Sequence, residues 1–281
     1  MEKGQGHDGV ILMSMTSSSL SVSALIITFN EEKHIERCLA SLAWADEILV
    51  VDAFSRDRTP EICLRKDAPW SGKLNFIQKE WEGFRVQRNF ALEKAKNNWL
   101  LVVDADEECT PVLAARIKEL LMLPEGPPRR AYKIRRIEYF LGKPIHYGIW
   151  NDKEGYHGSY QDRFFHREGV YYVNDVHEYP VFQQKPGIIH EPLHHASITT
   201  EKFLDKMNKY TTIEAQDRID QGKRTNLLHI LVAFPAMFIK NYIRYKSYRD
   251  GIYGVIISLL EGVSRVVRHI KMWQIQQGKK W

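Results

Sequence analysis

The chain has 281 residues, 44% hydrophobic and 11% aromatic, an ordinary globular composition that can bury a sizeable core as one large domain or one domain with an appendage. Cys38, Cys63 and Cys109 have neither paired nor metal-type spacing, which excludes a disulfide framework and indicates reduced thiols in a cytosolic protein. The net charge of +5 is uneven, because residues 201–281 carry 15 Lys and Arg against 7 Asp and Glu and the rest is slightly acidic.

Residues 1–20 are expected to form a loose N-terminal leader, since their short apolar run is interrupted at once by serines and threonine and does not resemble a signal peptide. From 21 to 125, apolar β-rich stretches alternate with amphipathic helical stretches, which predicts a mostly parallel sheet in an α/β half. Asn30 is expected to cap the first helix. Strands are predicted at 23–30, 47–55, 73–81 and 99–107, and helices at 31–42, 56–66, 83–98 and 111–123.

The second half of the chain has a different character. The segment PEGPPRR breaks the alternation, and residues 126–198 are aromatic and rich in histidine, with short strand-like pieces and no helical period. We interpret this part as an acceptor-binding half. Residues 199–281 are predicted to be a basic, amphipathic helical tail.

Polar residues follow three of the predicted strands: Thr28, Asn30 and Glu31 after the first, Asp52 and Ser55 after the second, and Asp104 and Asp106 after the buried run LLVV. Ligands of open α/β sheets bind beyond the carboxyl ends of the strands, so one shared site is expected there. Carboxylates two residues apart suit Mg²⁺ or Mn²⁺, and such a metal suits a diphosphate. The alternative is that these acids only cap the next helix, a role that we assign to Glu107.

Several motifs occur together in residues 23–123. They are Thr28-Phe29-Asn30-Glu31-Glu32, Val50-Val51-Asp52-x-x-Ser55-x-Asp57-x-Thr59, Gln87-Arg88-Asn89-Phe90-Ala91 and Asp104-Ala105-Asp106-Glu107. As a set they resemble the family 2 glycosyltransferases of the GT-A fold. A second set of motifs is Trp44-Ala45-Asp46-Glu47, Trp81-Glu82-Gly83-Phe84, Tyr160-Gln161-x-Arg163-x-Phe165 and Val176-His177-Glu178. These are similar to lipopolysaccharide core glucosyltransferases that act on heptose, and they extend the resemblance through most of the chain.

The resemblance implies an inverting transfer of a hexose, glucose in the first instance, from a nucleoside diphosphate sugar such as a UDP-sugar to a lipid-linked saccharide, with Mg²⁺ or Mn²⁺ as cofactor. It implies that the segment from Thr28 through Asn30 to Glu31, together with Asp52, holds the nucleoside. Arg88 would bind the base or a phosphate, Asp104 would lie near the ribose and the metal, and Asp106 would be the main metal ligand. One departure is visible, because Phe54 replaces a small glycine beside the nucleoside and puts the base preference in doubt.

An inverting transferase needs a general base for the attacking hydroxyl. Glu178 is the first choice and Asp162 the second, while Arg163, in the same Tyr160-Gln161-x-Arg163 motif as Asp162, is interpreted as a partner of the diphosphate. His195, rather than His194, is interpreted as an additional metal ligand. The alternatives are an exposed glutamate for Glu178, a surface ion pair for Arg163 and a structural hydrogen bond for the histidine.

The apolar runs 227–239 and 252–260 flank a tyrosine-rich basic segment, 240–251, which favours an interfacial helix pair over a spanning helix. An anionic membrane surface suits this pattern better than nucleic acid. We therefore predict a cytoplasmic protein, peripheral on the inner face of the cytoplasmic membrane. A buried helical hairpin or a homodimer interface stays an alternative.

Two rival functions use the same residues. A phosphohydrolase or nucleotidyltransferase could use Asp104 and Asp106 for metal-assisted phosphoryl transfer, but two strand–helix units precede these residues, an order that disfavours it. A catalytically inactive membrane-surface adaptor would be favoured by the loss of an acidic residue at a strand end, and none is missing.

Overall fold

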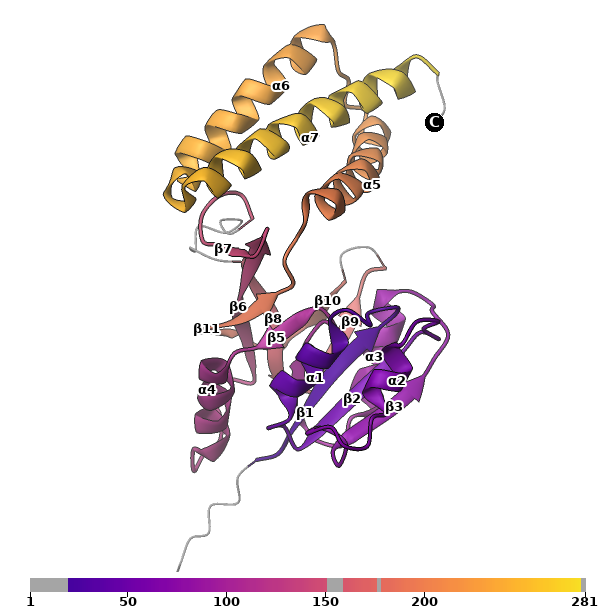
Figure 1. Cartoon of the computed structure of the whole chain (residues 1–281), viewed down its shortest axis with the longest axis vertical. Coiled ribbons are helices and arrows are strands. Elements are labelled where there is room, and N and C mark those ends of the chain that lie inside the picture. The colour runs from indigo at the N-terminus through magenta and orange to yellow at the C-terminus, as the bar shows by residue number, and fades with distance from the viewer. Residues whose placement is uncertain (1–19, 151–158, 176–177, 279–281) are drawn as a thin grey trace, which may run out of the picture.

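The structure is a computed structural model that describes residues 20–150, 159–175 and 178–278. An α/β body occupies the lower part of Figure 1, and the residues after Thr200 form a helical region at the opposite end. The three cysteines are buried and free, in agreement with the reduced thiols that the sequence predicts.

Four parallel strands form the N-terminal half of the sheet, in the spatial order β3-β2-β1-β4. The alternation of strands and helices predicted from the sequence is confirmed. The strands are β1 (Val22–Thr28), β2 (Glu47–Asp52), β3 (Leu74–Gln78) and β4 (Trp99–Val102), and the helices between them are α1 (Ile35–Leu42), α2 (Thr59–Cys63) and α3 (Phe84–Lys94).

The central strands are apolar throughout because both faces of the sheet are covered. Successive side chains of a strand point to opposite faces, so Ala24 and Ile26 of β1 pack with α1, α2 and α4 (Pro111–Met122), whereas Leu25 packs with α3. The same division holds in β4, where Leu101 joins the first layer and Leu100 joins the second.

The second half of the chain extends the same sheet with antiparallel pairings, except that β11 runs parallel to β6. Beyond β4 the order continues β8-β6-β11-β5, with β7 paired to β6, and β9 and β10 form a separate two-stranded sheet. These strands are β5 (Glu107–Cys109), β6 (Ala131–Phe140), β7 (Lys143–Ile145), β8 (Ser159–His166), β9 (Tyr171–Val173), β10 (Tyr179–Val181) and β11 (Gly187–His195).

Strand β8 contains a bulge at Arg163. Phe164 lies opposite Tyr132 of β6 and Asp162 lies opposite the next residue, Lys133, so Arg163 is the extra residue between them. A bulge bends its strand and re-aims a side chain. Here it lies directly beside the end of β4, where the candidate site is.

The tail is helical, as predicted from the sequence. Its elements are α5 (Thr200–Asp220), α6 (Leu227–Ile239), a π-helical turn (Lys240–Arg244), a 3₁₀ turn (Ser247–Asp250) and α7 (Ile252–Gln276). Helices α6 and α7 pack as a hairpin (Figure 1). Gly262 makes this packing close, since a Cβ there would lie 2.8 Å from the ring of Phe234.

The hairpin is joined to the body by specific hydrogen bonds. The Asn241 side chain accepts from the backbone N–H of Ile149 at 2.7 Å and donates to Ser258 at 3.0 Å. Asp250 accepts from the backbone N–H of Tyr147 at 2.9 Å. The basic segment between the apolar runs therefore docks partly onto the loop after β7 and is not wholly solvent-exposed.

The capping role expected of Asn30 is wrong. The N-cap residue of α1 is His34, which makes no side-chain cap bond. Asn30 has φ of 54°, a left-handed conformation that asparagine tolerates, and its side chain accepts from the backbone N–H of Arg56 at 2.8 Å. The asparagine stabilises the loop after β2 instead of the helix.

Candidate functional site

The polar strand ends meet at one edge of the sheet. The order β3-β2-β1-β4 has its switch between β1 and β4, which is where open α/β sheets bind ligands. Thr28 ends β1 opposite Asp52 of β2, and Asp104 follows β4 by two residues. The hydroxyl oxygen of Thr28 is buried at this edge and has no hydrogen-bond partner among the described residues, which is unusual for a buried polar atom.

The loop after β2 is held by the Asp52 carboxylate. Its oxygens accept from the backbone N–H and the hydroxyl of Ser55, at 2.9 and 2.5 Å, and from the Gln78 side chain at 3.1 Å. Phe54 lies within this loop with φ of 58° and is 48% exposed. An exposed aromatic ring in a left-handed conformation is strained, and such strain is typical of functional loops.

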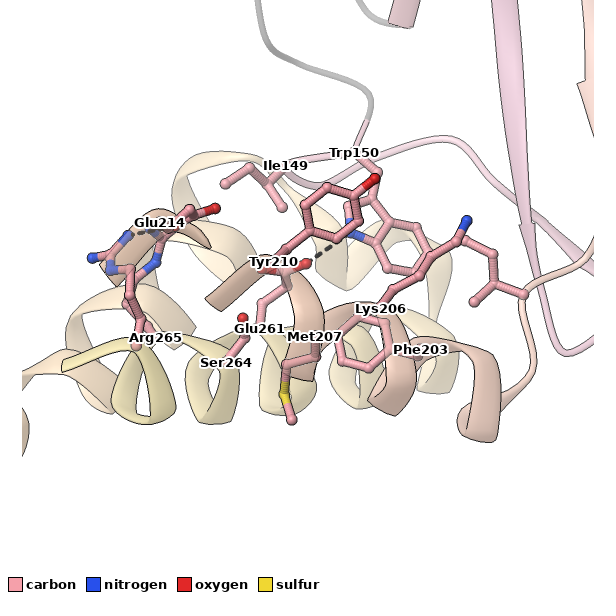
Figure 2. Close-up of a pocket in the computed structure, with 12 residues that line it drawn as sticks. Ile149, Trp150, Phe203, Lys206, Met207, Tyr210, Glu214, Glu261, Ser264 and Arg265 are labelled. Atoms are coloured by element: carbon pink, nitrogen blue, oxygen red, sulfur yellow. Dashed lines mark hydrogen bonds and ion pairs between the residues drawn. The ribbon is translucent and has the colours of Figure 1, made fainter. Parts of the chain in front are cut away.

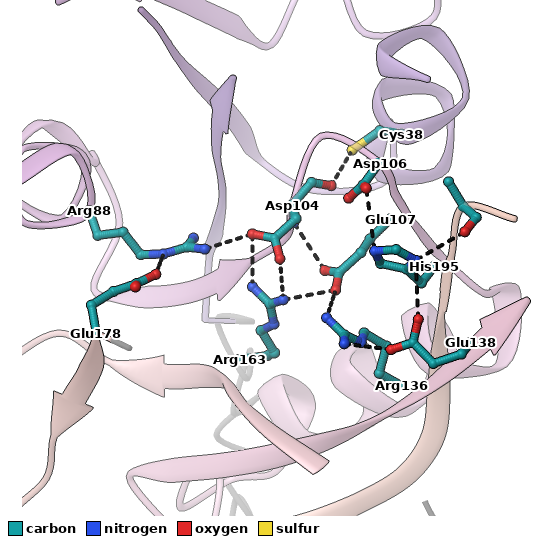
Figure 3. A network of polar contacts seen from close by, with 11 residues as sticks. Cys38, Arg88, Asp104, Asp106, Glu107, Arg136, Glu138, Arg163, Glu178 and His195 are labelled. Carbon is teal, nitrogen blue, oxygen red and sulfur yellow. Dashed lines mark hydrogen bonds and ion pairs between the residues drawn. The ribbon is translucent and has the colours of Figure 1, made fainter. Parts of the chain in front are cut away.

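Asp104 is held by two arginines (Figure 3). Arg163 donates to both of its carboxylate oxygens, at 3.2 and 2.5 Å, and Arg88 from α3 donates to one of them at 2.6 Å. Burial alone would raise the pKa of Asp104, but Arg163 and Arg88 hold this pKa well below its usual range. Both oxygens therefore accept from arginine, which leaves the metal role predicted for Asp104 without support from this arrangement.

Glu107 is fully buried in β5 and belongs to the same cluster. It accepts from Arg163 at 2.8 Å and from the backbone N–H of Asp104 at 3.0 Å. Burial raises the pKa of Glu107 against the lowering effect of Arg163. The helix-capping role expected of Glu107 is wrong, because Thr110 is the N-cap of α4 and accepts from the backbone N–H of Leu113 at 3.3 Å.

Asp106 faces His195 across the site. The Nε2 atom of His195 lies 3.3 Å from an oxygen of Asp106, and its Nδ1 atom lies 3.2 Å from Glu138 and 3.0 Å from the carbonyl oxygen of Ala196 (Figure 3). Two acceptors around Nδ1 assign the proton to that nitrogen. The Nε2 lone pair and the Asp106 carboxylate then face each other, an arrangement that a proton or a metal cation between them would stabilise.

No three His, Cys, Asp or Glu side chains converge as a complete metal cage within the described ranges. Asp106 and His195 nevertheless fit Mg²⁺ or Mn²⁺ as two protein ligands, because substrate phosphates and water normally complete such sites. The Glu138 contact to Nδ1 is the outer hydrogen bond that commonly orients a metal-binding histidine. His194 lies apart from this pair and contacts the hydroxyl of Tyr139 at 3.3 Å.

Glu31 lies at the same edge. Burial, followed by the nearby negative charge of Asp106, raises the pKa of Glu31 to about 7. Lys202 at the start of α5 lowers this pKa in part, and it also contacts His34 at 3.1 Å. The first turn of the helical tail therefore adjoins the site.

The two candidate bases lie in different places. Glu178 is mostly buried, and one of its oxygens lies 3.4 Å from Nε of Arg88, so Arg88 bridges Glu178 and Asp104 (Figure 3). Asp162 lies on β8 opposite Lys133 of β6. The motif residues Val176 and His177 lie outside the described residues.

Sequence reasoning missed the inner part of this network. Arg136 contacts Glu138 at 2.5 Å and Glu107 at 3.5 Å, and neither Arg136 nor Glu138 was considered. The available signal was the run KIRRIEYF, in which charged residues interrupt an otherwise apolar strand. Buried charges in such a strand need partners, and functional sites are a frequent reason for them.

Comparison with known proteins agrees with this geometry. Residues 23–159 match the family described as Glycosyl transferase family 2. The "Lipopolysaccharide core biosynthesis glycosyltransferase LpsC" of Rhizobium meliloti (strain 1021) is 29% identical over 260 residues, covering 91% of this chain and 93% of that protein. An uncharacterized glycosyltransferase of Rickettsia bellii (strain RML369-C) is 27% identical, covering 90% of this chain and 86% of that protein.

Among solved structures, the crystal structure of S. aureus TarS 1-349 is similar at a TM-score of 0.41 and 16% identity, over 93% of both chains. Because this TM-score is low, the similarity does not assign a role to any residue. The family match covers the strands β1 to β4 and the polar edge described above. The predicted α/β fold of the GT-A type is confirmed, and residues 23–159 form a family 2 glycosyltransferase domain.

Proposed function

We propose that this enzyme transfers a hexose, glucose in the first instance, from a UDP-sugar to a lipid-linked core saccharide with inversion at the anomeric carbon. The observation that carries the proposal is the pairing of Asp106 with His195 beside the Asp104–Arg163 cluster, at the switch point of the sheet. The UDP-sugar rests on the family resemblance. The lipid-linked core saccharide is supported by the relative from Rhizobium meliloti, whose name gives lipopolysaccharide core biosynthesis.

In this proposal the β1–β2 edge binds the nucleoside. Asn30 is exposed and Glu31 is partly exposed at that edge, so both can hydrogen-bond to a base or ribose. Thr28 and Asp52 are buried behind them and would contact the nucleoside only if the loop after β2 moves when the donor binds. Arg88 and Arg163 fix the Asp104 carboxylate toward the same edge.

Asp106 and His195 are the residues that would hold Mg²⁺ or Mn²⁺, and this metal would stabilise the negative charge of the leaving diphosphate. His195 is fixed for that task by its Nδ1 contacts with Glu138 and Ala196. Asp106 is fixed by its backbone, whose carbonyl oxygen accepts from the N–H of Ala196 at 2.8 Å. Both proposed ligands are therefore held before the donor binds.

Glu178 is the proposed base. It would take the proton of the acceptor hydroxyl while that oxygen attacks the anomeric carbon, and the bond to the diphosphate would break with its electron pair on the departing oxygen. Arg88 holds the Glu178 carboxylate on the side of Asp104. Asp162 stays the second candidate.

The acceptor and the membrane are proposed to lie on the side of the helical tail. By length and composition, Leu227–Arg244 reaches the limit of a helix that could span a membrane, with a mean hydropathy of 1.2, yet only 17% of this stretch is buried within the protein. Lys240, Arg244 and the internal Pro235 favour a helix lying at the interface. We therefore propose a peripheral protein of the inner face of the cytoplasmic membrane.

The rival functions are less well supported. The family match over the acidic edge argues against a phosphohydrolase or nucleotidyltransferase. An inactive adaptor would not need the Asp106–His195 pair or the fixed Asp104. Both rivals predict that no sugar is transferred from a nucleotide sugar to an acceptor saccharide.

Calorimetry with uridine, guanosine and thymidine diphosphates, with and without Mn²⁺, tests the proposal. We expect one nucleotide to bind with metal-dependent affinity, and Asp106→Ala to remove that dependence. Glu108→Ala is the matched control, because Glu108 is also an acid near Asp106 but pairs with Arg37 on the surface, at 3.1 Å. Metal-dependent binding that survives Asp106→Ala would rule out the proposed ligand set.

The base is tested separately. Glu178→Gln is expected to bind the donor normally and to lower turnover by about a hundredfold or more. Asp175→Asn is the control, since Asp175 is an exposed acid of the same segment that pairs with Arg85 at 2.7 Å. Near-normal turnover of Glu178→Gln would remove Glu178 from this role.

A further inference from the structure

A groove between α6 and α7 carries a concentration of positive charge that the proposed transfer reaction does not use. It has a volume of about 480 Å³ and is lined by apolar side chains of α6 together with Lys240, Arg265, Arg268 and two histidines. All the lining residues lie in the described part of the chain, and none of them is an acid. The groove therefore combines an apolar wall with three cationic side chains.

Arg265 and Arg268 are poorly neutralised. Both point to the same carboxylate, Glu214 of α5, at 3.9 and 3.1 Å, and the Glu214 side chain is 51% exposed. Arg268 itself is only 4% exposed, and its Nε atom has no hydrogen-bond partner among the described residues. A buried guanidinium with an unsatisfied donor is costly unless an anion completes its contacts.

The two arginines also line a second cavity. That cavity, of about 360 Å³, lies between α5 and α7 and contains Trp150, Tyr210 and Lys206 (Figure 2). Burial, and then the neighbouring Arg265, lower the pKa of Arg268 to about 10. Positive charge is thus crowded at the point where the two cavities meet.

The charge balance of the whole hairpin points to an anionic partner. Residues 221–278 contain only two acids, and both are used internally: Asp250 accepts from the backbone N–H of Tyr147 at 2.9 Å, and Glu261 accepts from the Trp150 side chain at 2.8 Å. The same residues contain nine bases, namely Lys223, Arg224, Lys240, Arg244, Lys246, Arg249, Arg265, Arg268 and Lys271.

The apolar face of α6 lies beside this positive groove and is exposed. Leu228 is 66% exposed and lines the groove, and Leu231 is 64% exposed on the adjoining turn. A row of exposed large apolar side chains along one helix, bordered by bases, is typical of helices that lie in the interfacial region of a membrane. The other members of this row are Leu227, Val232, Ile239 and Ile243.

We propose that the α6–α7 groove binds the phosphate headgroup of an anionic membrane phospholipid, with Arg265 and Lys240 contacting the phosphate, Arg268 beneath it and the exposed face of α6 among the acyl chains. A second copy of the chain is a poorer occupant, because a two-fold interface at this face would oppose one set of arginines to its own image. The inference deepens the membrane assignment in the proposed function and gives it a defined lipid site.

The position of the tail gives this site a use. His195, a proposed metal ligand, is followed after four residues by the first residue of α5, Thr200. Lys202 contacts His34 at the edge of the site, and α5 packs on α7. A lipid held in the groove would therefore fix the orientation of the active site relative to the bilayer on which the acceptor is carried.

The test is the binding of the full chain to phosphatidylcholine vesicles with and without phosphatidic acid. Lys240→Gln/Arg265→Gln removes two charges from the groove and leaves the buried Arg268 in place. Lys223→Gln/Arg224→Gln removes two charges from the exposed α5–α6 loop of the same tail and is the matched control. Both variants are first checked for unchanged thermal unfolding.

We expect the groove variant to lower affinity for the anionic vesicles at least about tenfold more than the control, since headgroup hydrogen bonds to charged groups add to long-range attraction. If the two variants lose the same amount of affinity for anionic vesicles, binding is non-specific adsorption and the proposed lipid site is wrong. Inorganic phosphate should weaken vesicle binding no more than sodium chloride of equal ionic strength. Full competition by phosphate would reassign the groove to a soluble anion.

Leu228→Ser/Leu231→Ser tests the apolar face. We expect this variant to lose the part of vesicle binding that persists at high salt, because ionic attraction is screened there and burial of apolar surface is not. The alternative outcome is that light scattering finds a dimer for the wild type and a monomer for this variant, and that neither protein binds vesicles. In that case α6 forms an interface between two copies of the chain. Donor binding by calorimetry on the same preparations shows separately whether the proposed transferase function holds.

Discussion

The guanidinium of Arg163 donates to both carboxylate oxygens of Asp104, at 3.2 and 2.5 Å, from a bulge in strand β8. A third contact, at 2.8 Å, joins Arg163 to the fully buried Glu107. One arginine therefore balances two acids from the segment that follows β4, and the stability of the site depends on it.

We expect Arg163→Gln to destabilise the fold by about 3–5 kcal/mol, because it leaves the fully buried Glu107 and the partly buried Asp104 without their main partner. Arg163→Lys keeps the charge but loses the planar guanidinium that donates to two oxygens at once, so it should lower the free energy of unfolding by about 2 kcal/mol. Urea unfolding followed by circular dichroism measures both. Arg116→Gln, which breaks an exposed pair with Glu119 on α4, is the control and should change stability by less than about 0.5 kcal/mol. If Arg163→Gln lowers the free energy of unfolding no more than the control does, Arg163 does not stabilise the two carboxylates.

The second prediction concerns the two adjacent histidines. His195→Gln should lower the Mn²⁺-dependent part of nucleotide affinity by about tenfold or more, since His195 directs Nε2 at Asp106. His194→Gln is the matched control on the same strand, because His194 contacts Tyr139 instead. Calorimetry with and without Mn²⁺ measures both variants. Equal effects of the two substitutions would mean that His195 acts only through the packing of β11.

Much of the site could be predicted from the sequence because its outer residues follow strands. Thr28, Asp52 and Asp104 each come at or just after an apolar run, and parallel strands bring such positions to one edge. The strands themselves were predictable since β1, β2 and β4 are apolar on both faces. The apolar runs and the polar residues that follow them were therefore enough to predict the parallel sheet and the acidic residues at its edge.

The inner residues could not be predicted in the same way, because their environment comes from distant strands. From its own acidic segment, Glu107 is predicted to cap a helix. It is buried because β11 pairs with β5 and because Arg136 and Arg163 approach it from other strands. Asn30 reads as a cap as well, yet the loop after β2 offers its side chain a closer donor, the N–H of Arg56. Long-range pairing decided both cases.

The third prediction is a pH dependence at Glu31. Its pKa is about 7 in the fold against an ordinary value of 4.5, so the folded chain holds a proton there that the unfolded chain has already lost. Stability should therefore fall as the pH rises through that window. Glu31→Gln removes the ionisable group, so it should match the wild type below the ordinary pKa of 4.5 and melt at a higher temperature above about pH 7.

Thermal melting across the pH range measures this difference. Glu93→Gln, at an exposed position of α3, is the control and should show no such pH-dependent gain. A melting difference for Glu31→Gln that is the same at acid and alkaline pH would mean that the Glu31 carboxyl titrates in its ordinary range.

The last prediction concerns Phe54, whose φ of 58° and 48% exposure combine backbone strain with an accessible ring beside Asp52. Phe54→Gly relieves the strain and removes the ring, whereas Phe54→Ala removes the ring and keeps the strain. Phe54→Gly should therefore be more stable than Phe54→Ala by about 1 kcal/mol.

If the ring contacts the base of the donor, both variants should narrow the difference in affinity between uridine and guanosine diphosphates to the same extent. Unchanged nucleotide preference in both variants would limit Phe54 to shaping the loop, and a change in Phe54→Gly alone would assign the preference to the backbone conformation and not to the ring.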